Sequence, residues 1–172
     1  KDLDTMESML KSYLNFAAMQ QQSVALKTSK VALKPYLEEI IEQLSPQFKD
    51  IAVSLTCSPS IEIKADLHWL ARAIQNIISN ALRYAKSTIA ITVEVSGKQL
   101  SIHVADDGPG IAPHEQQAVL KPFYQSAQHR NQHGYGLGLA ICNKVMLWHH
   151  GELLVGNCLS LGGAKFTLRL TL

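Results

Sequence analysis

The sequence has few of the features that mark extracellular, membrane-spanning or nucleic-acid-binding proteins. Its three cysteines, Cys57, Cys142 and Cys158, are far apart, which excludes a paired zinc or redox motif and fits a reducing compartment. No apolar run approaches the roughly 18 to 20 residues that a membrane span needs, and no signal peptide is evident. The 16 basic and 14 acidic residues give a net charge of only +2. We therefore expect no nucleic-acid partner and no direct membrane contact.

The 172 residues are enough for one hydrophobic core with a smaller appended element. From Asp4 to about Gln22 apolar residues recur at helical spacing, and a polar stretch follows. This predicts a boundary near residue 25, which separates residues 1–24 from residues 25–172. The first helix either packs on the main body or belongs to a helical bundle that other parts of the protein complete, and we favour the bundle. Because the chain begins with Lys1, we expect it to be a fragment.

Beyond residue 25 the apolar pattern alternates between helical and strand periods. Helices are expected at residues 34–44, 66–86 and 137–150, the second of them capped by Asp66. Strands are expected at residues 29–32, 51–56, 89–95, 100–105, 152–156 and 165–172, with hairpin turns between the third and fourth and between the last two. The mixture predicts an α+β fold, a two-layer sandwich whose mostly antiparallel sheet is covered by helices on one face.

Three polar side chains share one face of the helix expected at residues 66–86. Asn76 and Asn80 are four residues apart, and Arg83 follows three residues later. One interpretation is an ordinary solvated face. The other is a site in which an amide oxygen binds Mg²⁺ while Arg83 meets phosphate oxygens, since Mg²⁺ prefers hard oxygen ligands and keeps several waters.

A second block begins with Asp106, at the end of an expected strand. Gly108 and Gly110 follow it and allow positive φ and a close approach of the backbone. An ionised carboxylate only accepts hydrogen bonds, so it suits the exocyclic amine of adenine and rejects the carbonyl of guanine. The alternative is an ordinary turn at the end of a strand.

A third block, Gly134, Gly136 and Gly138, precedes an expected helix, where unpaired backbone N–H groups favour phosphate. No Lys-Ser or Lys-Thr pair follows it, so this is not a Walker loop. The segment from Ala112 to His133 has little periodicity, and its position between the two glycine blocks predicts a lid that closes over a nucleotide, with Arg130 as an added cation.

The order of these blocks resembles the ATP-binding catalytic domain of bacterial sensor histidine kinases, within the GHKL ATPase superfamily and its Bergerat-type fold. Residues 76–84 look like the N box and residues 106–110 like the first glycine box. Pro122 and Phe123 look like the F box, residues 134–138 like the second glycine box, and Gly162 with Gly163 like a late glycine pair. The resemblance covers roughly residues 30–172. Gln125 departs from the arginine that many relatives have after the F box.

The resemblance implies roles for these residues. ATP and Mg²⁺ would be bound, with Asn80 as the metal ligand, Asn76 and Arg83 facing the phosphates, Tyr84 beside the nucleotide and Asp106 reading adenine. The residues expected to bind nucleotide are Asn76, Asn80, Arg83, Tyr84, Asp106, Gly108, Gly110, Ile111, Phe123, Arg130, Gly134, Tyr135, Gly136, Leu137, Gly138 and Leu139.

The same resemblance makes residues 1–24 the second helix of the dimerisation domain. The family's acceptor His lies in an earlier helix, beside an acidic residue, and the only such pair here, His114 with Glu115, follows the adenine block. The acceptor is therefore expected to be absent. The full-length protein would be a homodimer in the bacterial inner membrane with this part on the cytoplasmic side, and it would pass phosphate to a response-regulator receiver domain.

Two other interpretations remain open. One is an anti-sigma or serine-kinase type of ATPase on the same fold. The other is an interaction module that has lost its catalytic activity.

Overall fold

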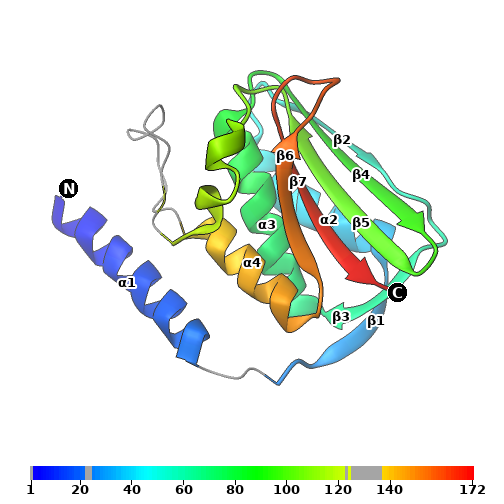
Figure 1. The fold of residues 1–172 in the computed structure, drawn as a ribbon, viewed down its shortest axis with the longest axis horizontal. Coiled ribbons are helices and arrows are strands. Elements are labelled where there is room, and N and C mark those ends of the chain that lie inside the picture. Colours follow the sequence, from blue (N-terminus) through cyan, green and yellow to red (C-terminus); the bar gives the residue numbers. More distant parts are fainter. Residues whose placement is uncertain (1, 22–24, 123, 125–136) are drawn as a thin grey trace.

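A computed structural model gives the architecture of the chain, and it describes residues 2–21, 25–122, 124 and 137–172. Its core is a two-layer α+β sandwich, which confirms the predicted fold class (Figure 1). The helices are α1 (Asp2–Gln21), α2 (Leu33–Leu44), α3 (Leu67–Tyr84) and α4 (Gly138–Trp148), with short 3-10 turns at Ser45–Gln47, Pro113–Glu115 and Ala118–Leu120. The strands are β1 (Thr28–Ala32), β2 (Ala52–Thr56), β3 (Glu62–Asp66), β4 (Thr88–Ser96), β5 (Gln99–Asp106), β6 (Glu152–Asn157) and β7 (Ala164–Thr171).

The main sheet has five strands in the order β2-β4-β5-β7-β6. Only the β2–β4 pair is parallel, and the other three pairs are antiparallel. Both expected hairpins form, and Gly97 adopts a φ of 62° in the turn between β4 and β5. The sequence analysis missed β3, which pairs with β1 as a separate two-stranded sheet.

One face of the sheet packs against α3 and α4, which lie side by side, with α2 next to α3 (Figure 1). The apolar residues of α3 recur every three or four positions, so they lie on one face of the helix and pack into the core. Alternate residues of β4, β5 and β7 meet it from the sheet. The largest fully buried side chains are Phe166, Leu33, Leu37, Leu70, Ile74, Ile77, Ile78, Ile89, Ile91, Leu100, Ile102 and Met146.

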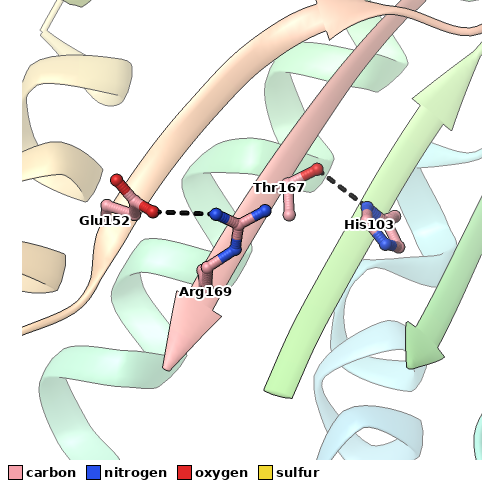
Figure 2. Close-up of polar contacts among 4 residues, drawn as sticks. All are labelled: His103, Glu152, Thr167 and Arg169. Atoms are coloured by element: carbon pink, nitrogen blue, oxygen red, sulfur yellow. Dashed lines mark hydrogen bonds and ion pairs between the residues drawn. The ribbon is translucent and has the colours of Figure 1, made fainter. Parts of the chain in front are cut away.

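The other face of the sheet carries polar side chains that pair across strands (Figure 2). The Arg169 guanidinium on β7 donates to the Glu152 carboxylate on β6 at 3.0 Å. Two residues earlier in β7, Thr167 hydrogen-bonds the His103 ring of β5 at 2.8 Å. This face therefore needs no second layer of helices.

The first helix, α1, leaves most of its described large apolar side chains in solvent. Figure 1 shows α1 outside the two layers, at the edge of the molecule. Leu3, Met6, Leu10 and Leu14 are between 55% and 80% exposed, whereas Phe16 is only 5% exposed. None of the described helices combines the length and apolar character required of a membrane span.

Asp66 joins three parts of the fold at the start of α3. Its carboxylate accepts the Trp69 N–H at 3.2 Å, which is the helix cap predicted from the sequence. The same carboxylate accepts the Lys27 N–H at 2.9 Å, so it also holds the segment that leads from α1. The Asp66 N–H in turn donates to Nε2 of His149, at the end of α4, at 3.0 Å. The start of α3 is thereby fixed to the end of α4.

Asp107 fixes the opposite end of α3. Its carboxylate accepts the backbone N–H groups of Lys86, Ser87 and Thr88 at 2.8 to 3.2 Å and the Ser87 hydroxyl at 2.7 Å. These contacts, the Ser87 hydroxyl above all, hold the pKa of Asp107 well below its usual range. Asp107 therefore has a structural role, and it ties the α3–β4 connection to the loop after β5.

We expect Asp107→Ala to lower the free energy of unfolding by about 1–2 kcal/mol at neutral pH, because several hydrogen bonds to a partly exposed carboxylate are lost. Urea denaturation measures this. A depressed pKa in the folded state contributes stability above the unfolded pKa of about 4 and loses it as the pH falls below that value. The difference from wild type should therefore shrink at acid pH. Asp50→Ala, at an exposed carboxylate in a turn, is the control and should change little at any pH.

Candidate nucleotide site

The last residue of β5, Asp106, is a buried carboxylate whose two oxygens differ. Its side chain lies in the interior, and the residue is only 1% exposed. Oδ1 accepts the N–H of Gly108 at 2.8 Å and the N–H of Ala164 at 3.3 Å. Oδ2 is buried and has no hydrogen-bond partner among the described residues. Buried polar atoms are nearly always paired, so an open carboxylate oxygen indicates a place for a donor from a ligand.

Two glycines make this arrangement possible because neither leaves room for a side chain. A Cβ at Gly163, just before β7, would collide with both the backbone and the carboxylate oxygen of Asp106. A Cβ at Gly108 would collide with the carbonyl oxygen of Tyr84, the last residue of α3. The backbone is therefore packed closely around Asp106, and the loop after β5 touches the end of α3.

The surroundings oppose ionisation of Asp106. Burial raises the pKa of this carboxyl, the hydrogen bonds from Gly108 and Ala164 offset part of the effect, and the nearby charge of Asp107 adds to it. The ionised carboxylate therefore has no hydrogen-bond donor at Oδ2 among the described residues. A neutral donor placed at Oδ2 would stabilise it.

The amide of Asn76 is the second buried polar group without a partner. Its Nδ2 is buried and makes no hydrogen bond to any described residue. A Cβ at Gly138, the first residue of α4, would lie 3.8 Å from both Cβ and Cγ of Asn76. The start of α4 therefore lies against this part of α3 and shields the Asn76 Nδ2 from solvent, although the residue as a whole is half-buried.

The other two residues of the predicted polar face follow about one and two turns further along α3. Asn80 is half-buried one turn after Asn76, and Arg83 is exposed in the last turn of α3. The Arg83 guanidinium carbon lies 5.9 Å from the centre of the Tyr84 ring. The α3 face thus changes along the helix from two half-buried amides to an exposed cation.

Helix α4 begins without a side-chain cap. Its first residue is Gly138, and the Ile141 N–H closes the first turn on the Leu137 carbonyl at 2.9 Å. The N–H groups before Ile141 have no partner within the helix, which makes the end suitable for an anion. Leu137 is buried, and Leu139 packs against the core.

The described structure thus brings together residues from all three sequence blocks. Gly108 packs against Tyr84, Gly138 packs near Asn76, and Asp106 ends the strand that leads into the loop containing Gly108. Ile111 also packs against the core at the end of that loop. Five residues expected to bind nucleotide lie outside the described residues, so their roles remain predictions: Phe123, Arg130, Gly134, Tyr135 and Gly136.

Sequence reasoning did not assign a role to three residues that shape the site. Gly163 was noticed only as part of a late glycine pair, although it packs directly on Asp106. Ala164 acts through its backbone N–H, which any residue except proline would supply. Asn157 holds Ile111 from the end of β6, and nothing in the sequence pattern connects those two positions.

A family model described as histidine kinase-, DNA gyrase B-, and HSP90-like ATPase matches residues 65–172, well over half of the chain. The chain belongs to this family. The matched span of this ATPase domain runs from the end of β3 to the C-terminus and contains α3, the loop after β5, α4 and the late glycine pair.

Individual relatives of the ATPase domain are sensor proteins. The sensor protein RstB of Escherichia coli K12 is 30% identical over 97% of this chain and 39% of its own length. The sensor histidine kinase CpxA of the same organism is 28% identical over 97% of this chain and 37% of its own. The crystal structure of full-length ShkA in complex with AMPPNP is 26% identical, with a TM-score of 0.81 over 97% of this chain and 36% of that chain. The chain spans about two fifths of the length of these relatives.

The open oxygen of Asp106 leads to a stability prediction. We expect Asp106→Asn to leave the free energy of unfolding at neutral pH unchanged or to raise it by up to about 2 kcal/mol, because a buried charge is removed while an oxygen remains for Gly108 and Ala164. Thermal or urea denaturation measures this.

The effect of Asp106→Asn on stability should depend on pH because the pKa of Asp106 is raised in the folded protein. A raised carboxyl pKa in the folded state costs stability once the pH exceeds the unfolded value of about 4. The advantage of the Asn variant should therefore disappear below about pH 4. A neutral-pH loss above about 3 kcal/mol would instead mean that the carboxylate holds the fold together.

Proposed function

We propose that this chain is the ATP-binding catalytic domain of a sensor histidine kinase, and that it binds ATP with Mg²⁺ between α3, the loop after β5 and α4. The observation that carries this proposal is the buried carboxylate of Asp106, with one oxygen held by two backbone N–H groups and the other open. Membership of the ATPase family and homology to sensor histidine kinases support it.

Asp106 recognises adenine. Its ionised carboxylate only accepts hydrogen bonds, and Oδ2 is the atom still able to accept one. The exocyclic amine of adenine supplies the missing donor, whereas guanine would present a carbonyl oxygen to a buried negative charge. Because a site with a buried polar group strongly rejects a ligand that leaves it unpaired, this contact selects ATP over GTP.

The phosphates lie toward α4 and the N-box face of α3. The buried Nδ2 of Asn76 donates to a phosphate oxygen, and the uncapped start of α4 contributes its N–H groups. Arg83 adds a cation at the exposed end of this face, and Tyr84 lies beside the nucleotide. The predicted nucleotide-binding roles of Phe123, Arg130, Gly134, Tyr135 and Gly136, which lie outside the described residues, belong to the same proposal.

The donor set of the site fits a magnesium ion that arrives with its nucleotide. Among the described residues no cluster of three or more His, Cys, Asp or Glu side chains could hold a metal on its own. Asn80, half-buried on α3, would offer one hard amide oxygen, and triphosphate oxygens and water would supply the other ligands, as Mg²⁺ prefers. The ion would neutralise charge on the phosphates.

The acceptor of the γ-phosphate is a histidine outside this chain. The exposed apolar side chains of α1 support its assignment, within residues 1–24, to the second helix of a dimerisation domain that pairs with further helices in a homodimer. That helix favours a sensor kinase over an anti-sigma type of ATPase. The phosphohistidine passes its group to a response-regulator receiver domain, with the whole protein in the bacterial inner membrane and this domain on the cytoplasmic side.

Titration calorimetry tests the proposed function. We expect the chain to bind Mg·ATP at micromolar to millimolar nucleotide, to bind GTP at least about tenfold more weakly and to show little autophosphorylation. Asn80→Ala should weaken Mg·ATP binding about tenfold while changing the affinity for magnesium-free ATP little, because only the metal ligand is lost.

The matched control is Gln75→Ala, which removes an amide from the same helix about 140° around its axis. It should bind Mg·ATP as wild type does. Absence of ATP binding by the folded wild-type chain at millimolar nucleotide would contradict the proposal. Equal losses in both alanine variants would contradict the assigned role of Asn80.

A further inference from the structure

Asn157, at the end of β6, binds the backbone of a residue 46 positions earlier. Its Oδ1 accepts the Ile111 N–H at 2.8 Å, and its Nδ2 donates to the Ile111 carbonyl at 2.8 Å. The side chain of Gln116 adds a longer contact, 3.4 Å, to the same carbonyl. One amide side chain therefore satisfies both backbone groups of a single loop residue, in the manner of a neighbouring β-strand.

The loop has a conformation that fits this amide. Gly110, directly before Ile111, has a φ of 77°, which side chains other than glycine rarely adopt. A Cβ at this glycine would lie only 2.8 Å from Oδ1 of Asn157. The absence of a side chain thus allows both the turn and the approach of the amide.

The same hairpin also holds the other end of the loop. In the β6–β7 register Asn157 lies opposite Ala164, whose N–H donates to Oδ1 of Asp106. Asp106 begins the segment that ends at Ile111. The residue pair next to the β6–β7 turn, Asn157 and Ala164, therefore contacts both Ile111 and Asp106, the two ends of this segment.

We propose that Asn157 is a positioning residue for adenine recognition, a role that rests on the proposed function. By fixing Ile111 it keeps the positive-φ turn at Gly110 in place, and this turn keeps the Gly108 N–H on Oδ1 of Asp106. The carboxylate then presents Oδ2 to the ligand in one orientation. The contact also fixes the point at which the segment beyond residue 111 leaves the core.

Nucleotide competition tests this role. We expect Asn157→Ala to bind Mg·ATP roughly five- to tenfold more weakly, and to discriminate less between ATP and GTP, because the loop that orients Asp106 loses two hydrogen bonds. Its thermal midpoint should fall by no more than a few degrees, since both bonds are exposed to water. Leu159→Ala is the matched control, because Leu159 is fully exposed in the same β6–β7 turn.

Two further measurements separate positioning from a general loss of structure. Asn157→Asp keeps an acceptor for the Ile111 N–H but places a second oxygen against the Ile111 carbonyl, so its ATP affinity should stay below that of wild type. In the nucleotide-free protein, hydrogen exchange at the Ile111 amide should speed up at least about tenfold in Asn157→Ala and remain unchanged in Leu159→Ala.

The outcomes distinguish this proposal from the function on which it rests. If wild type binds ATP, Asp106→Asn does not, and Asn157→Ala retains wild-type affinity and ATP/GTP ratio, the role of Asn157 is refuted while the proposed function stands. If wild type binds no ATP, both are refuted. Weaker binding with unchanged Ile111 exchange would also overturn the positioning role, because the loop would not have been released.

Discussion

The site in this domain depends on one buried carboxylate, Asp106, of which one oxygen is hydrogen-bonded and the other is not. Backbone N–H groups satisfy Oδ1 of Asp106. Gly108 and Gly163 pack so closely around it that a side chain at either position would collide with its neighbours. Oδ2 has no partner among the described residues. A buried, half-satisfied carboxylate costs free energy, so the fold around it must supply stability from elsewhere. The five-stranded sheet and its helical layer do so.

Three aspartates show how one chemical group serves different purposes. Asp66 caps α3 and holds the segment from α1, while Asp107 gathers the N–H groups of the α3–β4 connection. The carboxylate oxygens of Asp66 and Asp107 therefore accept hydrogen bonds from the protein itself. Asp106 is the last residue of β5 and continues the buried alternation of Leu100, Ile102 and Val104, so it points into the core, whereas Asp107 follows the strand in the loop. Only Asp106 among the three therefore retains an oxygen for a ligand.

The sequence predicted the features that depend on local periodicity. The α3 stripe, the strands β4 and β5 and the cap at Asp66 all follow from spacing within a few residues. The strand β3 was missed because its five residues run directly into α3, and the residues of β1 that pair with it lie at least 30 positions earlier. Helical spacing placed Asn76 and Asn80 on one face, but it could not show that α4 covers Asn76. The Asn157–Ile111 contact likewise exists only after folding.

The ionisation of Asp106 offers the most direct test of this account. Carbon-13 NMR of the side-chain carboxyl, titrated with pH, measures its pKa in the free protein, in the presence of saturating ADP, and in the presence of GDP at that same concentration. The account predicts a raised pKa in the free protein and a fall on binding ADP, because the adenine amine donates to the ionised form. GDP at the same concentration should leave the pKa unchanged. A pKa that does not respond to ADP, although ADP binds, would contradict the assignment of Asp106 as the adenine receptor.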